Sequence, residues 1–308
     1  MSKKFVNPAD YIVPININGM DGRLIRLENG NRHSKREILL IYDINSNIEK
    51  WWGLIVALKN YANVSVIDLP GLGGMDSFYT IGLKPTIDNM ADYLSAFIKL
   101  KYKRKSLSVM GIGFGFVALT RMLQRNPEIG SKVDLVVCLN GYAHKDAFKF
   151  TKAKKQLRRA YSYLCSTKPV SDIVRLALFN RPFLEARYPV SKMPNRRDDG
   201  LAKEFARQFK IDLIKATDFR TRMFLNIELL KLDNCTSRIN KTLWHITTSR
   251  SDPEVDQKLV EQHFKVIFDQ YIHLPTKIKG GMPVILNDQK LALKFLPAKL
   301  RRQLRVHS

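Results

Sequence analysis

The hydrophobic positions of this chain form short continuous runs that alternate with longer amphipathic segments. Residues 37–42 and 133–139 are almost entirely apolar, which is typical of strands buried on both faces of a sheet, and residues 63–69 (NVSVIDL) are predicted to form a further strand. Residues 51–61 and 86–100 instead carry apolar side chains at helical spacing. Alternation of such strands and helices predicts an α/β fold, in which helices cover both faces of a mostly parallel sheet.

A glycine-rich turn joins a further apolar strand to a helix that runs to Gln124. The turn reads Gly111-Ile112-Gly113-Phe114-Gly115 and follows residues 106–110. It resembles the nucleophile elbow of α/β-hydrolases, G-x-S-x-G, in which the central residue is the attacking serine. Here Gly113 takes the place of the serine. Glycine has no hydroxyl group, so this position cannot form an acyl-enzyme.

Other segments extend the resemblance to the α/β-hydrolase superfamily. Residues 68–73 (DLPGLG) are similar to that family's D-x-P-G-x-G loop, and Trp51-Trp52 follows the segment where the family has its oxyanion loop. Residues from Lys241 to about Leu300 resemble the last two strands and the final helix. The resemblance therefore implies three parts. They are a hydrolase core over 1–141, a mainly helical cap over 142–240, and the rest of the core with a basic tail over 241–308.

A dinucleotide-binding site is the alternative interpretation of the glycines, and the sequence disfavours it. The G-x-G-x-x-G fingerprint requires a glycine at position 116, which is Phe116. The fingerprint also belongs in the first βαβ unit, with an acidic residue about 20 residues later. At least two predicted strands precede this turn, and Asp134 falls at the start of the next strand.

The resemblance also indicates where the rest of a catalytic triad would lie. Asp252 follows the predicted strand 243–248 and matches the family's acid, although an Asp before Pro253 is equally suited to cap a helix. Met282, in the segment Gly-Gly-Met, stands where the family has its histidine. His245 and His273 lie inside predicted strands, from which neither is expected to reach the elbow.

The predicted oxyanion loop also departs from the family pattern, because it reads Tyr42-Asp43 where many members have His-Gly. A carboxylate at Asp43 that faces the site repels the developing oxyanion. The residues predicted to surround a pocket or ligand are Tyr42, Asp43, Gly113, Phe114 and Asp252. Three cysteines without C-x-x-C and six histidines without H-x-x-x-H predict neither a metal site nor a disulfide framework, and no cofactor is expected.

Charge distinguishes the predicted cap from the core. Residues 145–238 hold 22 Lys and Arg against 10 Asp and Glu, and the whole chain has a net charge of +24. Helices are predicted over 149–165, 170–179, 201–215 and 219–232, with a proline-containing loop between the second and third. The densest basic surface is predicted from one run: Lys152, Lys154, Lys155, Arg158 and Arg159. Such charge attracts polyanions at low salt, although no nucleic-acid motif is present.

Three functions follow from these observations. The first is a non-catalytic protein that holds a small molecule or a partner segment in the pocket under the cap. The second is an active α/β-hydrolase-superfamily enzyme with a non-standard site that uses Asp43, Asp252 or cap residues. The third is a polyanion-binding protein that uses the basic cap. No apolar run reaches the length of about 18 residues typical of a membrane span, and no signal peptide is apparent, so a cytoplasmic location is expected.

Overall fold

The computed structural model describes residues 8–30, 36–103, 106–193, 203–248, 254–276, 285–286 and 288–306. Eight strands form one sheet in the order β1-β2-β4-β3-β5-β6-β7-β8, and every pairing from β4 to β8 is parallel. The mostly parallel sheet expected from the apolar runs is therefore confirmed. The strands are β1 (Ile12–Ile17), β2 (Met20–Leu27), β3 (Glu37–Ile41), β4 (Asn63–Ile67), β5 (Leu107–Ile112), β6 (Val133–Leu139), β7 (Ile239–Thr247) and β8 (Phe268–Pro275).

An N-terminal hairpin that the sequence analysis did not predict forms one edge of the sheet. Strands β1 and β2 pair antiparallel around Asn18 and Gly19, both of which have positive φ, as a tight hairpin turn requires. Strand β2 then pairs antiparallel with β4. β1 contains Pro14, which an edge strand tolerates because one side of it needs no ladder hydrogen bond.

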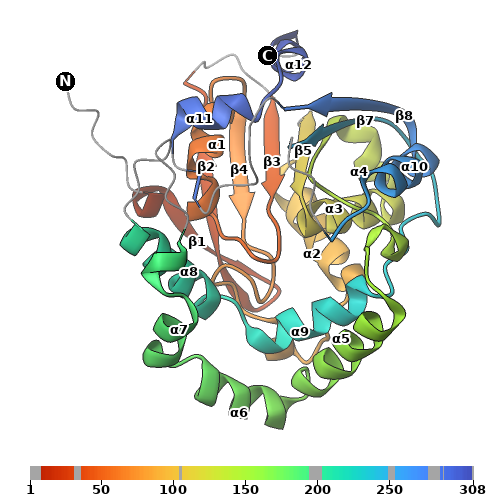
Figure 1. The fold of residues 1–308 in the computed structure, drawn as a ribbon. Helices are drawn as coiled ribbons and strands as arrows, with labels where there is room; N and C mark the ends of the chain where they lie inside the picture. Colours follow the sequence, from red (N-terminus) through yellow and green to blue (C-terminus); the bar gives the residue numbers. More distant parts are fainter. Residues whose placement is uncertain are drawn as a thin grey trace.

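Helices cover both faces of the sheet (Figure 1) and bury two separate apolar clusters against it. One face carries α2 (Ile87–Lys101), α3 (Phe114–Arg125), α4 (Pro127–Lys132) and α10 (Gln257–Ile267). The other carries α1 (Trp52–Leu58), α11 (Gln289–Lys294) and α12 (Ala298–Val306). Short 3-10 helices span Pro8–Tyr11, Glu49–Trp51, Phe78–Ile81, Lys145–Ala147 and Val190–Lys192.

The described residues between β6 and β7 contain five α-helices, and we refer to this segment, which the sequence analysis assigned to a cap, as the cap. The helices are α5 (Lys152–Cys165), α6 (Lys168–Leu178), α7 (Arg181–Arg187), α8 (Lys203–Lys215) and α9 (Phe219–Leu229). Figure 1 shows them as an arc beyond one end of the parallel strands. Helix α7 corrects the prediction of a loop there. Pro182 lies in its first turn, where the missing N–H of proline costs no helical hydrogen bond. In the described residues, no helix is long and apolar enough to cross a membrane.

The segments that enter and leave the cap lie side by side. His144 and Asp233 form an isolated antiparallel bridge, and the backbone N–H of Asn234 donates to the carbonyl of Ala143 at 2.9 Å. The cap therefore departs from and returns to the core at one place.

Candidate functional site

The glycine turn forms the sharp connection that the sequence predicts. Strand β5 ends at Ile112, helix α3 begins at Phe114, and Gly113 between them has φ +53° and ψ −120°. Side chains other than hydrogen are strained in this region of backbone space. Gly115 allows a close approach, because a Cβ there would lie 2.4 Å from the carbonyl oxygen of Ile41. The backbone of a nucleophile elbow is therefore present without a side chain at its centre.

The carboxylate of Asp43 fills the space above Gly113. Its Oδ1 accepts a hydrogen bond from the backbone N–H of Phe114 at 2.8 Å. A Cβ built on Gly113 would lie 2.5 Å from the same Oδ1 and 2.6 Å from the Asp43 Cγ. In an elbow of this type, the N–H after the nucleophile normally helps to stabilise the oxyanion. Here that donor is already bound by an anion that the protein itself supplies.

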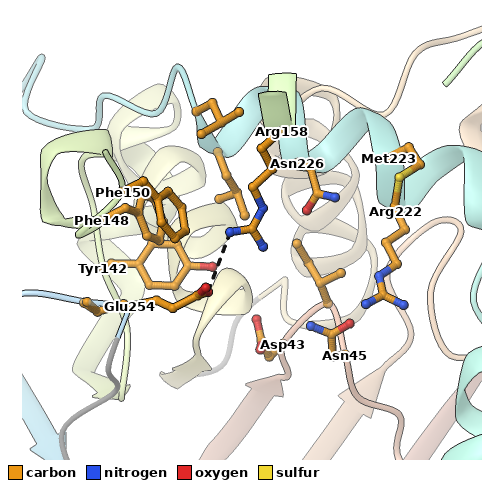
Figure 2. Close-up of a pocket in the computed structure, with 14 residues that line it drawn as sticks. Asp43, Asn45, Tyr142, Phe148, Phe150, Arg158, Arg222, Met223, Asn226 and Glu254 are labelled. Carbon is orange, nitrogen blue, oxygen red and sulfur yellow. Dashed lines mark ion pairs between the residues drawn. The ribbon is translucent and has the colours of Figure 1, made fainter. Parts of the chain in front are cut away.

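A cavity of about 240 Å³ lies between this end of the sheet and the cap. Figure 2 shows Asp43 and Asn45 on the core side and Arg222, Met223 and Asn226, from α9, on the cap side. Aromatic side chains form another wall: Tyr142, Phe148 and Phe150. The rings of Phe148 and Phe150 are stacked, with centroids 5.7 Å apart. The cavity thus combines an apolar wall with charged groups of both signs.

Two arginines of the cap line this cavity in different electrostatic environments. Arg158, from α5, pairs with Glu254 at 3.6 Å (Figure 2), and Lys154 also pairs with that carboxylate, at 3.0 Å. The backbone N–H of Arg222 donates to the carbonyl of Asp218 at 3.0 Å, but its guanidinium forms no ion pair and no hydrogen bond with any residue that the structure describes. Burial lowers the pKa of Arg222 and outweighs the opposing effect of the charge on Asp43. Arg222 therefore brings a poorly solvated positive charge to the cavity.

A second cation lies close to Asp43 on the core side. Burial lowers the pKa of Lys50, whereas the Asp43 carboxylate opposes this shift. The Lys50 Nζ donates to the backbone carbonyl of Asn45 at 3.5 Å. The Asp43 carboxylate therefore has two cations near it, Lys50 on the core side and Arg222 on the cap side.

Of the four predicted pocket residues that the structure describes, only Asp43 lines this cavity; Tyr42, Gly113 and Phe114 do not. Phe114 is fully buried in the core. Tyr42 is also fully buried, and its hydroxyl donates to Asp68, which further accepts from Arg23 Nε at 2.6 Å. Burial raises the pKa of Asp68 to about 7, against the opposing effects of Arg23 and Tyr42. Arg23 also pairs with Glu49 at 2.6 Å, so this buried cluster ties β2 to the loops after β3 and β4.

No histidine that the structure describes lines the cavity. His245, on β7, is buried, and its Nδ1 lies 2.9 Å from the Tyr271 hydroxyl. Burial lowers its pKa to about 3, with a smaller contribution from His273. His273 lies 2.8 Å from Thr247 through its Nε2. Both therefore occupy strand positions, as the sequence predicts.

The proposed acid and histidine positions, Asp252 and Met282, lie outside the described residues. All five members of the predicted basic surface lie on α5, and only Arg158 lines the cavity. In the described part of the chain, no cluster of three His, Cys, Asp or Glu side chains could hold a metal ion. The site built from described residues is thus a charged and aromatic cavity beside Gly113.

Several cavity residues were not predicted from the sequence. Phe148, Phe150 and Glu254 come from connecting segments, and Asn226 comes from a helix that the sequence assigned only to the cap. Arg222 entered the sequence analysis only in the count of basic residues over 145–238. The sequence did predict a helix over 219–232 in the cap, and this helix was the one signal that could have placed Asn226 and Arg222 above a hydrolase-type pocket. Nothing local distinguishes the other three from ordinary loop residues.

Comparison with known proteins was informative only at the level of structure. No protein-family model and no curated protein matches the sequence. Among solved structures, the epoxide hydrolase CorEH has 14% identity and a TM-score of 0.66, with 96% of this chain and 99% of that chain covered. A thermophilic esterase from Thermogutta terrifontis has 14% identity and a TM-score of 0.60, with 96% and 98% covered. The Cif epoxide hydrolase from Acinetobacter nosocomialis has 13% identity and a TM-score of 0.66, with 94% and 88% covered.

These similarities extend over nearly the whole chain, cap included, and agree with the sheet order and the glycine elbow. The chain has the α/β-hydrolase fold. At these identities the similarity establishes the fold, and function has to be inferred from the site itself.

Proposed function

We propose that this protein binds a small molecule in the cavity beside Gly113 and does not catalyse serine-type acyl transfer. The observation that carries the proposal is the Asp43 carboxylate, which accepts the Phe114 N–H and fills the space of an elbow side chain. An acyl transfer reaction develops negative charge on an oxygen held by that N–H. Placing a second anion beside Asp43 is electrostatically unfavourable, so the site opposes the transition state it would need to stabilise.

The charges and rings of the cavity indicate the kind of ligand. Arg222 offers a poorly solvated guanidinium that suits a carboxylate or phosphate group. Tyr142 and the stacked Phe148 and Phe150 offer an apolar surface on another wall. A cavity of about 240 Å³ accommodates a small ligand only. We therefore expect a compact molecule with one anionic group and one apolar or aromatic part.

One observation favours a second candidate, an enzyme in which Asp43 reacts. Its carboxylate lines the cavity at the position that an elbow nucleophile would occupy, and carboxylates serve as nucleophiles in covalent catalysis. In such a reaction, a carboxylate oxygen attacks an electrophilic carbon of the substrate and the leaving oxygen takes up a proton. Water then hydrolyses the ester formed on Asp43. Two of the similar structures are epoxide hydrolases, which makes epoxides the substrates to test first.

A ligand-binding screen tests the first candidate, because a protein without a functional cavity would bind none of the compounds there. A library of small aromatic and aliphatic carboxylates and phosphates is screened by thermal shift and confirmed by calorimetry. For the hits, Arg222→Gln is expected to lower affinity about tenfold or more, since it removes a charge-assisted contact. Arg159→Gln removes the same charge from an exposed position of α5 outside the cavity, and should leave affinity unchanged. Equal losses in both variants would show that binding depends on net charge and not on this cavity.

Mass spectrometry separates the two candidates. The protein is incubated with a panel of epoxides and esters, and the intact mass and tryptic peptides are compared with those of Asp43→Asn. The proposal expects neither turnover nor an adduct. A transient ester on Asp43, absent from Asp43→Asn and accompanied by turnover, would establish the enzyme and overturn the binding-only function.

A further inference from the structure

The outer surface of the cap exposes an unusual number of large apolar side chains. Eight of the thirteen exposed large hydrophobic residues in the described part of the chain lie between 157 and 205. They are Leu157, Tyr161, Tyr163, Leu164, Ile173, Leu176, Phe183 and Phe205. Six of the eight belong to two consecutive helices, α5 and α6. Isolated exposed hydrophobic residues are normal, but such a concentration indicates an interaction surface.

Each of these helices is amphipathic, and each presents one apolar side to solvent. On α5, Leu157, Tyr161 and Leu164 follow the i, i+4, i+7 spacing of a single helix side. On α6, Ile173 and Leu176 share a side. The buried α5 residues Ser162 and Cys165 mark the side that packs against the rest of the cap, where Cys165 clusters with the α9 residues Phe219 and Met223. Tyr161, one turn before Cys165, borders that side, whereas Leu157 and Leu164 lie farther from it. The exposed apolar residues are thus additional to the packing of the cap.

Basic side chains accompany the apolar ones. Residues 152–187 hold nine Lys and Arg but only Asp172 and Glu185 as acids. Four of the nine pair with a carboxylate, and the other five form no ion pair with any residue that the structure describes: Lys152, Lys155, Arg159, Arg175 and Arg187. Figure 1 shows α6 at the outer rim of the cap, on the side away from the sheet, with α5 and α7 as its neighbours. The surface therefore offers apolar groups and unpaired positive charge together.

We propose that helices α5 and α6 bind the surface of an anionic lipid bilayer. An amphipathic helix with apolar and basic side chains lies in the interfacial plane, with its apolar side inserted and its cations near the lipid phosphates. Tyr161 and Tyr163 suit the headgroup level because a tyrosine ring is apolar at one end and polar at the other. A nucleic acid would satisfy the cations but would leave Leu157, Leu164, Ile173 and Leu176 in water. A protein partner would need no excess of negative charge, so the lipid surface fits both features.

Vesicle sedimentation tests the proposal with the full chain at about 0.15 M salt, where weak long-range attraction is largely screened. The probes are phosphatidylcholine vesicles with and without about one-third phosphatidylglycerol. We expect binding to the anionic vesicles that is about tenfold or more stronger than binding to the neutral ones. The variant Leu157→Gln, Leu164→Gln, Ile173→Gln, Leu176→Gln should lose about tenfold or more of that binding. Its four side chains are 57–83% exposed, so the fold should be retained, as circular dichroism would verify.

A matched control removes exposed apolar residues elsewhere. Leu100 on α2 and Val266 on α10 are 56% and 57% exposed, and the double Gln variant should bind vesicles like the unaltered chain. Equal binding to neutral and anionic vesicles, or an equal loss in the control variant, would overturn the proposal. Sedimentation velocity tests the alternative that a second copy of the chain binds this surface. A dimer that the quadruple variant dissociates, without vesicle binding by the unaltered chain, would assign the surface to a second copy of the chain instead.

Discussion

Replacing Gly113 with serine tests the arrangement at the elbow directly. The substitution restores the side chain expected of a hydrolase, but it places a Cβ 2.5 Å from Asp43 Oδ1, so the carboxylate must move. When it moves, the hydrogen bond from the Phe114 N–H to Asp43 is lost. The backbone at Gly113, with φ +53°, adds strain because side chains are disfavoured there.

The expected loss of stability has two parts. Backbone strain of this kind costs about 1–3 kcal/mol. A hydrogen bond to a charged group contributes about 1.5–3 kcal/mol, which is also the expected cost of Asp43→Ala. Gly113→Ser should therefore lower the free energy of unfolding by about 2.5–6 kcal/mol. The hydrogen bond can be lost only once, so the double variant should cost about 1.5–3 kcal/mol less than the sum of the two single variants.

Chemical denaturation of four proteins measures this coupling: the unaltered chain, Gly113→Ser, Asp43→Ala and the double variant. Gly82→Ser is the matched control, since Gly82 has φ +75° and no atom within 4 Å of an added Cβ. It should show only backbone strain and no coupling to Asp43→Ala. Additivity within about 0.5 kcal/mol for Gly113→Ser and Asp43→Ala would refute the reasoning, because residues in contact are expected to couple. Ester hydrolysis by Gly113→Ser should stay near background, and robust turnover would mean that a base serves the elbow after all.

Three further outcomes are expected. Fluorophosphonate probes should leave the unaltered protein unlabelled, and a stoichiometric adduct on a serine near the elbow, found by mass spectrometry, would contradict the non-catalytic function. The pKa of His245, lowered to about 3, lies below its unfolded value near 6.5, so the unfolded chain binds more protons and acid weakens the fold between these values. From pH 6.5 to 5 the free energy of unfolding should fall by up to about 2 kcal/mol, and His245→Phe should remove that part of the pH dependence. Heparin binding should be weak and mostly lost near roughly 0.15 M salt, because salt reduces the free energy gained by counterion release. The variant for comparison replaces four cap cations with Gln: Lys154, Lys155, Arg158 and Arg159. Sub-micromolar heparin binding at that salt concentration, lost in this variant, would favour a polyanion partner.

The sequence predicted the parts of the fold whose signals are local. Buried strands such as β3 and β6 appear as nearly continuous apolar runs because most of their residues are covered on both faces of the sheet. The elbow could be identified because a sharp strand-to-helix turn requires glycines at fixed spacing. The hairpin β1–β2 was missed, since β1 is largely exposed and contains Pro14. Helix α7 was missed because Pro182 was interpreted as part of a loop, although proline is well suited to the first turn of a helix.

The site was predicted less completely than the fold. Asp43 was identified because its position follows a strand by a fixed offset, and its distance from Gly113 then came from the structure. Tyr42, one residue earlier, points the other way, into the buried cluster around Asp68. Arg222 and Glu254 come from segments far apart in the sequence, so their approach to one cavity depends on how the cap closes over the sheet. No spacing pattern in a single sequence reports such long-range proximity.

Because His144 and Asp233 pair with each other, the two ends of the cap lie close together, and the cap could be removed or exchanged as one segment. Because its two ends are already joined by backbone hydrogen bonds, a short linker from Ala143 to Asn234 could replace the whole insertion, and the core would then lose the buried side chains of Leu225 and Leu232. A chain built in this way would keep Gly113 and Asp43 but lose the roof that Arg222 and Arg158 provide. In the other direction, caps of different charge or shape could be grafted at the same two points. The proposed ligand site and the proposed lipid-binding surface would therefore both change on exchange of this one segment, while the glycine elbow would keep its sequence.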